Sequence, residues 1–166
     1  MTRYLLAAAL PAMLIAGAVH AACADPPAAG VNWARCFATG RDASGIDMSG
    51  ANLLEATLNN GNFEEARLNR ADGRRVKLIA ARMKGAALDE GQFADADFSR
   101  ADLSGASLRG VDLRRSRFFR TILRGVDLTG AKLDGADLLH ADLGGALWID
   151  GKTRCAEGSL GQCHPD

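Results

Sequence analysis

Residues 101–113 read ADLSGASLRGVDL, and the third, eighth and thirteenth residues of this stretch are all leucine. The five-residue spacing continues in both directions, and a large apolar residue occupies all but one of the 21 positions from Met48 to Trp148. We call these positions the centres of a repeating unit. The residue two places before each centre is small or β-branched throughout. So regular a pattern indicates a repeat protein rather than an irregular globule.

A period of five residues fits neither the 3.6-residue period of an α-helix nor the two-residue alternation of a long strand. The chain must therefore turn every five residues, so that the centre and the residue two before it both face a core. These two inward residues and the outward residue between them form a very short extended segment, and the other two residues form a corner. One such layer cannot bury its apolar side alone. Successive layers must therefore stack through backbone hydrogen bonds, ~4.8 Å apart.

Units of the form A-[DN]-L-x-x recur along the chain and resemble the signature of pentapeptide-repeat proteins. Clear examples are Ala51-Asn52-Leu53, Ala101-Asp102-Leu103, Ala136-Asp137-Leu138 and Ala141-Asp142-Leu143. The resemblance implies an all-β fold, a right-handed quadrilateral β-helix with four faces and twenty residues per coil. Residues 46–150 would then form about five coils, and a solenoid this short needs capped ends.

The N-terminal residues have the parts of a cleaved secretory signal peptide. Arg3 precedes an apolar stretch and small residues, so we expect cleavage after Ala21, with Ala22 and Ala24 as alternative sites. The apolar stretch is short for a membrane span. We therefore expect a periplasmic or secreted protein with no stable membrane span after cleavage. The predicted segments are the signal peptide (1–21), a linker with an N-terminal cap (22–45), the β-helix (46–150) and a C-terminal disulfide loop (151–166).

Bulky apolar residues flank the repeat at both ends. The N-terminal group lies in residues 31–37 and includes Trp33 and Phe37, and the C-terminal group is Trp148 and Ile149. Stacked coils need such lids to prevent fraying and end-to-end pairing. We interpret both groups as caps and the two tryptophans as plugs rather than ligand platforms.

Four cysteines in an exported chain favour disulfides over metal ligands. Of the three possible pairings, Cys23–Cys36 with Cys155–Cys163 is the simplest, because each pair flanks one end of the repeat. A zinc site that used the C-terminal pair and His164 would lack a fourth ligand. We therefore expect no metal and no cofactor.

The charges cancel, with 20 Lys and Arg against 20 Asp and Glu. The resemblance raises one specific function, mimicry of DNA by an acidic rod that occupies a topoisomerase, but an export signal and a neutral surface disfavour it. No nucleic-acid partner is expected. Motifs of hydrolases, metalloproteases and phosphate loops are absent from the sequence, so we assign no catalytic residue. The aspartates one before the centres are interpreted as surface side chains that satisfy nearby backbone groups.

Reading positions twenty apart shows which residues would stack in successive coils. One column, just after the centre, holds Ile79, Phe119 and Leu139 where polar residues are expected. Exposed apolar patches often mark contacts, although isolated apolar surface residues are also normal. We predict that this column contacts an unknown protein partner or a second copy of the chain, and that the protein is a non-enzymatic binding or scaffold module of the cell envelope.

Other columns suggest structural roles. Charges alternate along Glu55, Arg75, Asp95 and Arg115, which predicts ion pairs between neighbouring coils. A corner column of four glycines after Glu65 predicts turns with positive φ. Gly73 is the one centre without a side chain, so its layer should contain a gap that leucine could fill.

Overall fold

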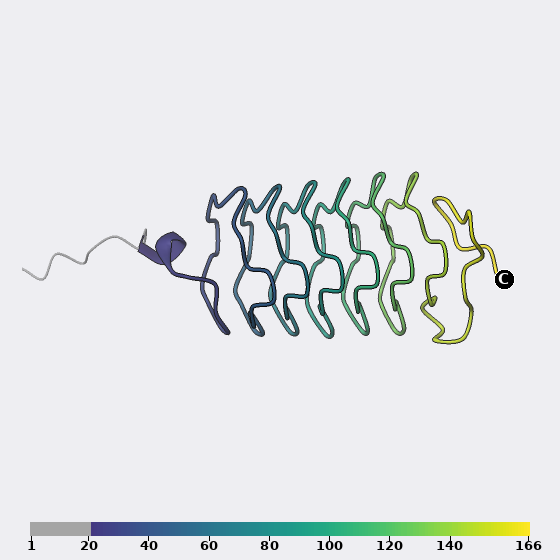
Figure 1. Cartoon of the computed structure of the whole chain (residues 1–166), viewed down its shortest axis with the longest axis horizontal. Helices are drawn as coiled ribbons and strands as arrows, with labels where there is room; N and C mark the ends of the chain where they lie inside the picture. The colour runs from purple at the N-terminus through teal and green to yellow at the C-terminus, as the bar shows by residue number, and fades with distance from the viewer. Residues whose placement is uncertain (1–20) are drawn as a thin grey trace, which may run out of the picture.

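The computed structural model describes residues 21–166, and residues 1–20, which contain most of the predicted signal peptide, lie outside the described part. The first element is a 3-10 helix, η1 (Ala21–Ala24). It is a single turn, and no helix in the described residues could span a bilayer. The chain then winds into a rod of stacked coils that runs from the N-terminal to the C-terminal end (Figure 1). Within residues 21–166 the coils pair through single-residue β-bridges rather than long strands.

Parallel bridges join residues that are 20 apart, from Asn32↔Asn52 to Asp127↔Leu147. Twenty residues therefore make one coil, and four five-residue units make its four faces. The predicted start of the β-helix at residue 46 is wrong, because the pairing already begins at Asn32. The sequence concealed the earlier units because Ala38 and Ala43 occupy two of their centres, where a large residue was sought.

Each unit ends in a β-turn. In one example, the amide of Ala51 donates to the carbonyl oxygen of Met48 at 3.0 Å. The residue two after the centre has positive φ in every unit from Gly30 to Gly145. The glycine column was predicted to need this conformation, and it has it. Many corner residues are not glycine, however, and Glu65 adopts φ 57° at the head of the same column.

The core is a column of side chains that stack from coil to coil. Phe98 and Phe118 lie parallel with ring centroids 5.2 Å apart, and Phe93 lies 5.8 Å from Phe98. Two buried hydroxyls also find partners: Ser116 donates to Leu113 O at 2.5 Å and Thr121 donates to Phe98 O at 2.7 Å. The buried polar groups therefore do not oppose the packing.

The predicted gap at Gly73 is absent. A Cβ atom on residue 73 would lie 2.3 Å from Cε1 of Phe93, so the phenylalanine ring of the next coil fills the space. At Gly61 the ring that fills the space belongs to the same five-residue unit: a Cβ atom there would lie 2.5 Å from Cε2 of Phe63. The missing side chain accommodates an oversized neighbour, because protein cores are packed without spare volume.

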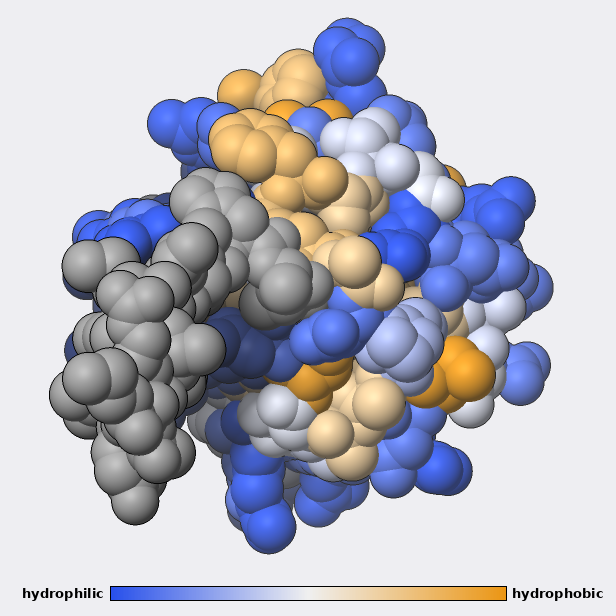
Figure 2. Space-filling model, turned by 90° about the vertical axis from the view of Figure 1, so that its left-hand side faces the viewer, coloured by the Kyte–Doolittle hydropathy of each residue, from blue (hydrophilic) through white to orange (hydrophobic). Residues whose placement is uncertain are grey.

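The N-terminal end is closed around Trp33, which is fully buried. Its indole Nε1 donates to Asp25 O at 3.2 Å, and the guanidinium of Arg41 lies 4.8 Å from the ring centroid. A disulfide joins Cys23 to Cys36 beneath this end. Phe37 does not belong to the lid as predicted: it occupies an outward position and is 87% exposed. Figure 2 shows this end of the rod, where apolar surface lies among hydrophilic residues at the rim.

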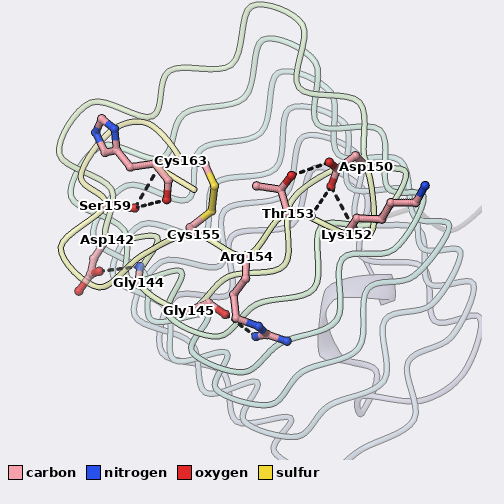
Figure 3. The surroundings of a disulfide bond; sticks show 11 residues. Asp142, Gly144, Gly145, Asp150, Lys152, Thr153, Arg154, Cys155, Ser159 and Cys163 are labelled. Atoms are coloured by element: carbon pink, nitrogen blue, oxygen red, sulfur yellow. Dashed lines mark hydrogen bonds between the residues drawn. A yellow bond between two sulfur atoms is a disulfide. The ribbon is translucent and has the colours of Figure 1, made fainter. Parts of the chain in front are cut away.

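The C-terminal segment folds back over two faces of the last coil. Leu160 and Arg154 form antiparallel bridges to Asp142 and Leu147. The Cys155–Cys163 disulfide holds this cap together (Figure 3), and the side chain of Cys155 is buried. Trp148 is partly buried against the core, whereas Ile149 remains 38% exposed.

Candidate protein-contact site

The turns align the three predicted contact residues along one edge of the rod. Ile79, Phe119 and Leu139 each occupy the first residue after a centre, on the same corner of different coils. Backbone bonds fix the stacking: Arg100 N donates to Phe119 O at 2.9 Å, and Arg120 N donates to Leu139 O at 3.1 Å. The structure therefore brings Phe119 and Leu139 into adjacent coils.

The three side chains differ in exposure. Leu139 is 55% exposed, whereas Ile79 and Phe119 are half-buried. The ring of Phe119 meets the ring of His140 edge-on, with centroids 5.9 Å apart. The amide of Ile79 donates to Asn59 Oδ1 at 3.0 Å, so this part of the edge is also held by a side-chain bond. The apolar surface thus strengthens toward the C-terminal end of the corner.

Two further apolar residues, missed in the sequence, extend this surface onto the next face. Ile122 is 39% exposed and Leu160 is 60% exposed. Asp142 forms bridges to both of them, one on each side, so the three residues lie in one column. We define the apolar corner as Ile79, Phe119, Ile122, Leu139 and Leu160.

A sequence signal existed for one of the missed residues. Ile122 stands one before a centre, where polar residues dominate its column: Asp42, Asn62, Arg82, Asp102 and Asp142. Reading that column by twenties would have found it. Leu160 gave no such signal, because it lies outside the repeat and reaches the column only through the fold of the cap.

The aspartates before the centres are structural, as predicted. In each case the carboxylate accepts a hydrogen bond from the amide two residues later, for example from Ser99 to Asp97 at 2.9 Å. The same bond is made by Asp47, Asp72, Asp102, Asp112, Asp127, Asp137 and Asp142. Side-chain hydrogen bonds from Arg114 also hold the pKa of Asp112 below its usual value. These carboxylates are occupied in holding turns.

The alternating column of charges forms ion pairs between coils. Arg75 pairs with Glu55, and Arg115 pairs with Asp95 at 2.8 Å. Charges also alternate one residue before the centre, along Lys77, Asp97, Arg117 and Asp137, and there Arg117 lies 3.8 Å from Asp97. The arginine-rich stretch 109–124 is therefore largely neutralised by neighbouring carboxylates. Within residues 21–166, no cluster of His, Cys, Asp or Glu side chains could hold a metal ion.

Comparison with known proteins agrees with this architecture. The family described as "Pentapeptide repeats (8 copies)" matches residues 38–70, 58–93, 77–115 and 112–147. The chain belongs to the pentapeptide-repeat family. Among proteins with curated functions, none matches this pentapeptide-repeat protein.

Solved structures of other pentapeptide-repeat proteins are similar. HetL of Nostoc sp. strain PCC 7120, which is involved in heterocyst differentiation regulation, is 32% identical, with a TM-score of 0.52. The match covers 74% of this chain and 62% of HetL, so the chain spans less than two thirds of that protein. A thylakoid lumen protein of Arabidopsis thaliana is 23% identical (TM-score 0.44; 75% and 84% covered). QnrB1, a plasmid-mediated fluoroquinolone resistance protein, is 20% identical (TM-score 0.42; 73% and 67% covered).

Proposed function

We propose that this pentapeptide-repeat protein is a non-enzymatic binding module that contacts another protein through its apolar corner. The observation that carries the proposal is the run of apolar side chains at outward positions, where Leu139 is 55% exposed. The β-helix backbone holds them in line, so little conformational entropy would be lost on binding. Apolar anchors of this kind supply most of the energy of many interfaces.

We also propose that the protein acts in the periplasm or outside the cell. Two disulfides, one at each end of the rod, support this location, because disulfides persist in oxidising compartments. The signal-like residues 1–21 support it independently. In this proposal the β-helix is right-handed. It has about six coils rather than five, because its bridges span residues 32–147 at 20 per coil.

The charge distribution favours a protein contact over DNA mimicry. A rod that imitates duplex DNA needs a regular surplus of negative charge, whereas this chain carries equal numbers of acidic and basic side chains. Most of its carboxylates also pair with arginines or hold turns. Hydrolysis by a carboxylate pair would need groups free to exchange protons in a cleft, and the turn aspartates are already bonded.

The substitution Phe119→Asp tests the contact surface. Phe119 points outward from the rod and is half-buried. The substitution should therefore leave the rod folded while it places a charge in the apolar corner. We expect loss of a partner co-purified from the envelope, or of a dimer seen by size-exclusion chromatography. Thr57→Asp, at an outward position of the same rod, is the control and should change neither. Unchanged partners and oligomeric state in a folded Phe119→Asp protein would exclude this surface.

A further inference from the structure

Two arginines beside the apolar corner have side chains with no hydrogen-bond or ion-pair partner. Every other arginine in residues 21–166 makes at least one hydrogen bond or ion pair, mostly with an aspartate or glutamate. The guanidinium groups of Arg100 and Arg120 make neither a hydrogen bond nor an ion pair within the described residues. The two arginines follow Ser99 and Phe119, so the two exceptions lie along the same edge of the rod as Ile79, Phe119 and Leu139.

The fold places these two cations close together. They occupy the same turn position in adjacent coils, ~4.8 Å apart along the rod, and both have positive φ. His140 follows in the next coil of the same column. The guanidinium of Arg120 lies 5.2 Å from the ring centroid of Phe119. Stacking like charges opposes folding, so this column is not explained by stability of the isolated rod.

We propose that the apolar corner binds an acidic and apolar peptide segment of a protein partner. Carboxylates of that segment pair with Arg100 and Arg120, and its apolar side chains pack on Phe119 and Leu139. Guanidinium groups suit this role because they bind carboxylates through two parallel hydrogen bonds. The inference rests on the proposed function, since it assigns the chemistry of the partner at the same surface.

The charges that flank the corner favour a narrow segment over an anionic membrane. Asp97 and Asp137 lie two residues before the column, in a row that also holds Lys77 and Arg117, and Arg117 lies 3.8 Å from Asp97. Asp102 and Asp142 lie on the next face, where Asp142 stands between Ile122 and Leu160. A flat bilayer laid on this edge would meet carboxylates on both sides and be repelled. A peptide that follows the edge along Phe119 and Leu139 would contact the arginines and apolar groups and leave most of the flanking carboxylates aside. Electrostatic complementarity of this kind sets the partner's specificity.

The test is selection of random twelve-residue peptides, displayed on phage, against the full chain without residues 1–21. We expect enriched peptides to combine Asp or Glu with Leu, Ile or Phe. Their synthetic versions should bind about tenfold more weakly to Arg100→Gln/Arg120→Gln, and more weakly at high salt. Arg70→Gln is the matched control, because Arg70 occupies the same turn position but pairs with Glu90 at 2.8 Å. The Arg70→Gln variant should bind the peptides as tightly as wild type does.

The outcomes separate the two proposals. Peptides that bind equally well to Phe119→Asp would show that the apolar corner is not the contact surface. Peptides whose binding needs Phe119 could still lack acidic residues, or bind Arg100→Gln/Arg120→Gln as tightly as wild type. Either result would overturn the acidic character of the partner but leave the contact surface standing. Failure to enrich any peptide would also overturn it. Binding to phosphatidylglycerol vesicles that is lost in Arg100→Gln/Arg120→Gln, without peptide binding, would assign the corner to a membrane instead.

Discussion

At the scale of single residues, Gly73 shows how tightly the core is filled. Leucine at this centre would collide with the ring of Phe93, because even a Cβ atom would lie 2.3 Å from it. We therefore expect Gly73→Leu to destabilise the protein by about 1–3 kcal/mol, the usual cost of overpacking. Urea unfolding followed by circular dichroism measures the change.

A second substitution checks the cause. Phe93→Leu alone leaves a space where the ring was. In Gly73→Leu/Phe93→Leu, the new leucine at position 73 fills part of that space. The double variant should therefore lose less stability than the sum of the single variants, because the two residues share one space. Equal or greater stability in Gly73→Leu would mean that the site holds a void.

Asp150 gives the fold a measurable dependence on pH. Hydrogen bonds from the Thr153 side chain and from the Lys152 and Thr153 amides lower the pKa of Asp150 to about 2 (Figure 3). An unfolded aspartate titrates near ~3.9. The stabilisation is thus fully present above about pH 4 and is lost as the pH falls toward 2.

We expect Asp150→Asn to flatten this part of the stability profile. The measurement is the urea midpoint of wild type and variant at several pH values between 2 and 5. Asp25→Asn, outside the repeat, serves as the control substitution. Parallel profiles of wild type and Asp150→Asn over this range would show that the carboxylate does not stabilise the fold.

At the scale of elements, the C-terminal cap depends on its disulfide. The cap closes two faces of the last coil, and the Cys155–Cys163 bond closes a loop with a sequence separation of 8. Removing the disulfide should lower the free energy of unfolding by about 2–3 kcal/mol, because the loop that it closes is short. We expect Cys155→Ser/Cys163→Ser to fray the last coil first, which hydrogen exchange of the amides of residues 141–148 would detect.

The pairing itself has a direct check. Peptide mapping without reduction should recover residue 23 linked to 36 and residue 155 linked to 163. Free thiols throughout, or a peptide that joins Cys36 to Cys155, would refute the pairing.

For the cap, equal hydrogen-exchange rates in wild type and Cys155→Ser/Cys163→Ser would show that the cap holds without its disulfide.

The repeating unit was predictable because its signal is redundant. Each centre repeats the same requirement, so an exception such as Gly73 does not obscure the register. The ends carried no such redundancy. Ala38 and Ala43 hid the first units, and the outward position of Phe37 follows only once those units are recognised.

The proposed contact site was predictable only in part, for the same reason. Ile79, Phe119 and Leu139 share a column of the repeat, which twenty-residue spacing reveals. Leu160 joins the neighbouring column of Ile122 and Asp142 through an antiparallel bridge formed by the cap. The lack of ion pairs at Arg100 and Arg120 also depends on which carboxylates the other arginines reach. The five-residue spacing does not show which side chains form such pairs.

At the scale of the whole molecule, the rod separates stability from recognition. Its core, turns and ion pairs hold the coils, and these parts use most of the polar side chains of the repeat. The exposed side chains of the apolar corner and the guanidinium groups of Arg100 and Arg120 take no such part. A stiff rod that leaves one edge unused by its own fold is suited to present that edge to a partner.

Site-specific photocrosslinking tests this account most directly. p-Benzoylphenylalanine replaces Leu139 in one variant and Asp134 in another; both are exposed first residues after a centre, on neighbouring corners. After irradiation of intact cells, the account predicts a discrete adduct from position 139 and none from position 134, and loss of that adduct when Phe119→Asp is added. Equal crosslinking from both positions, or no adduct from position 139, would contradict it.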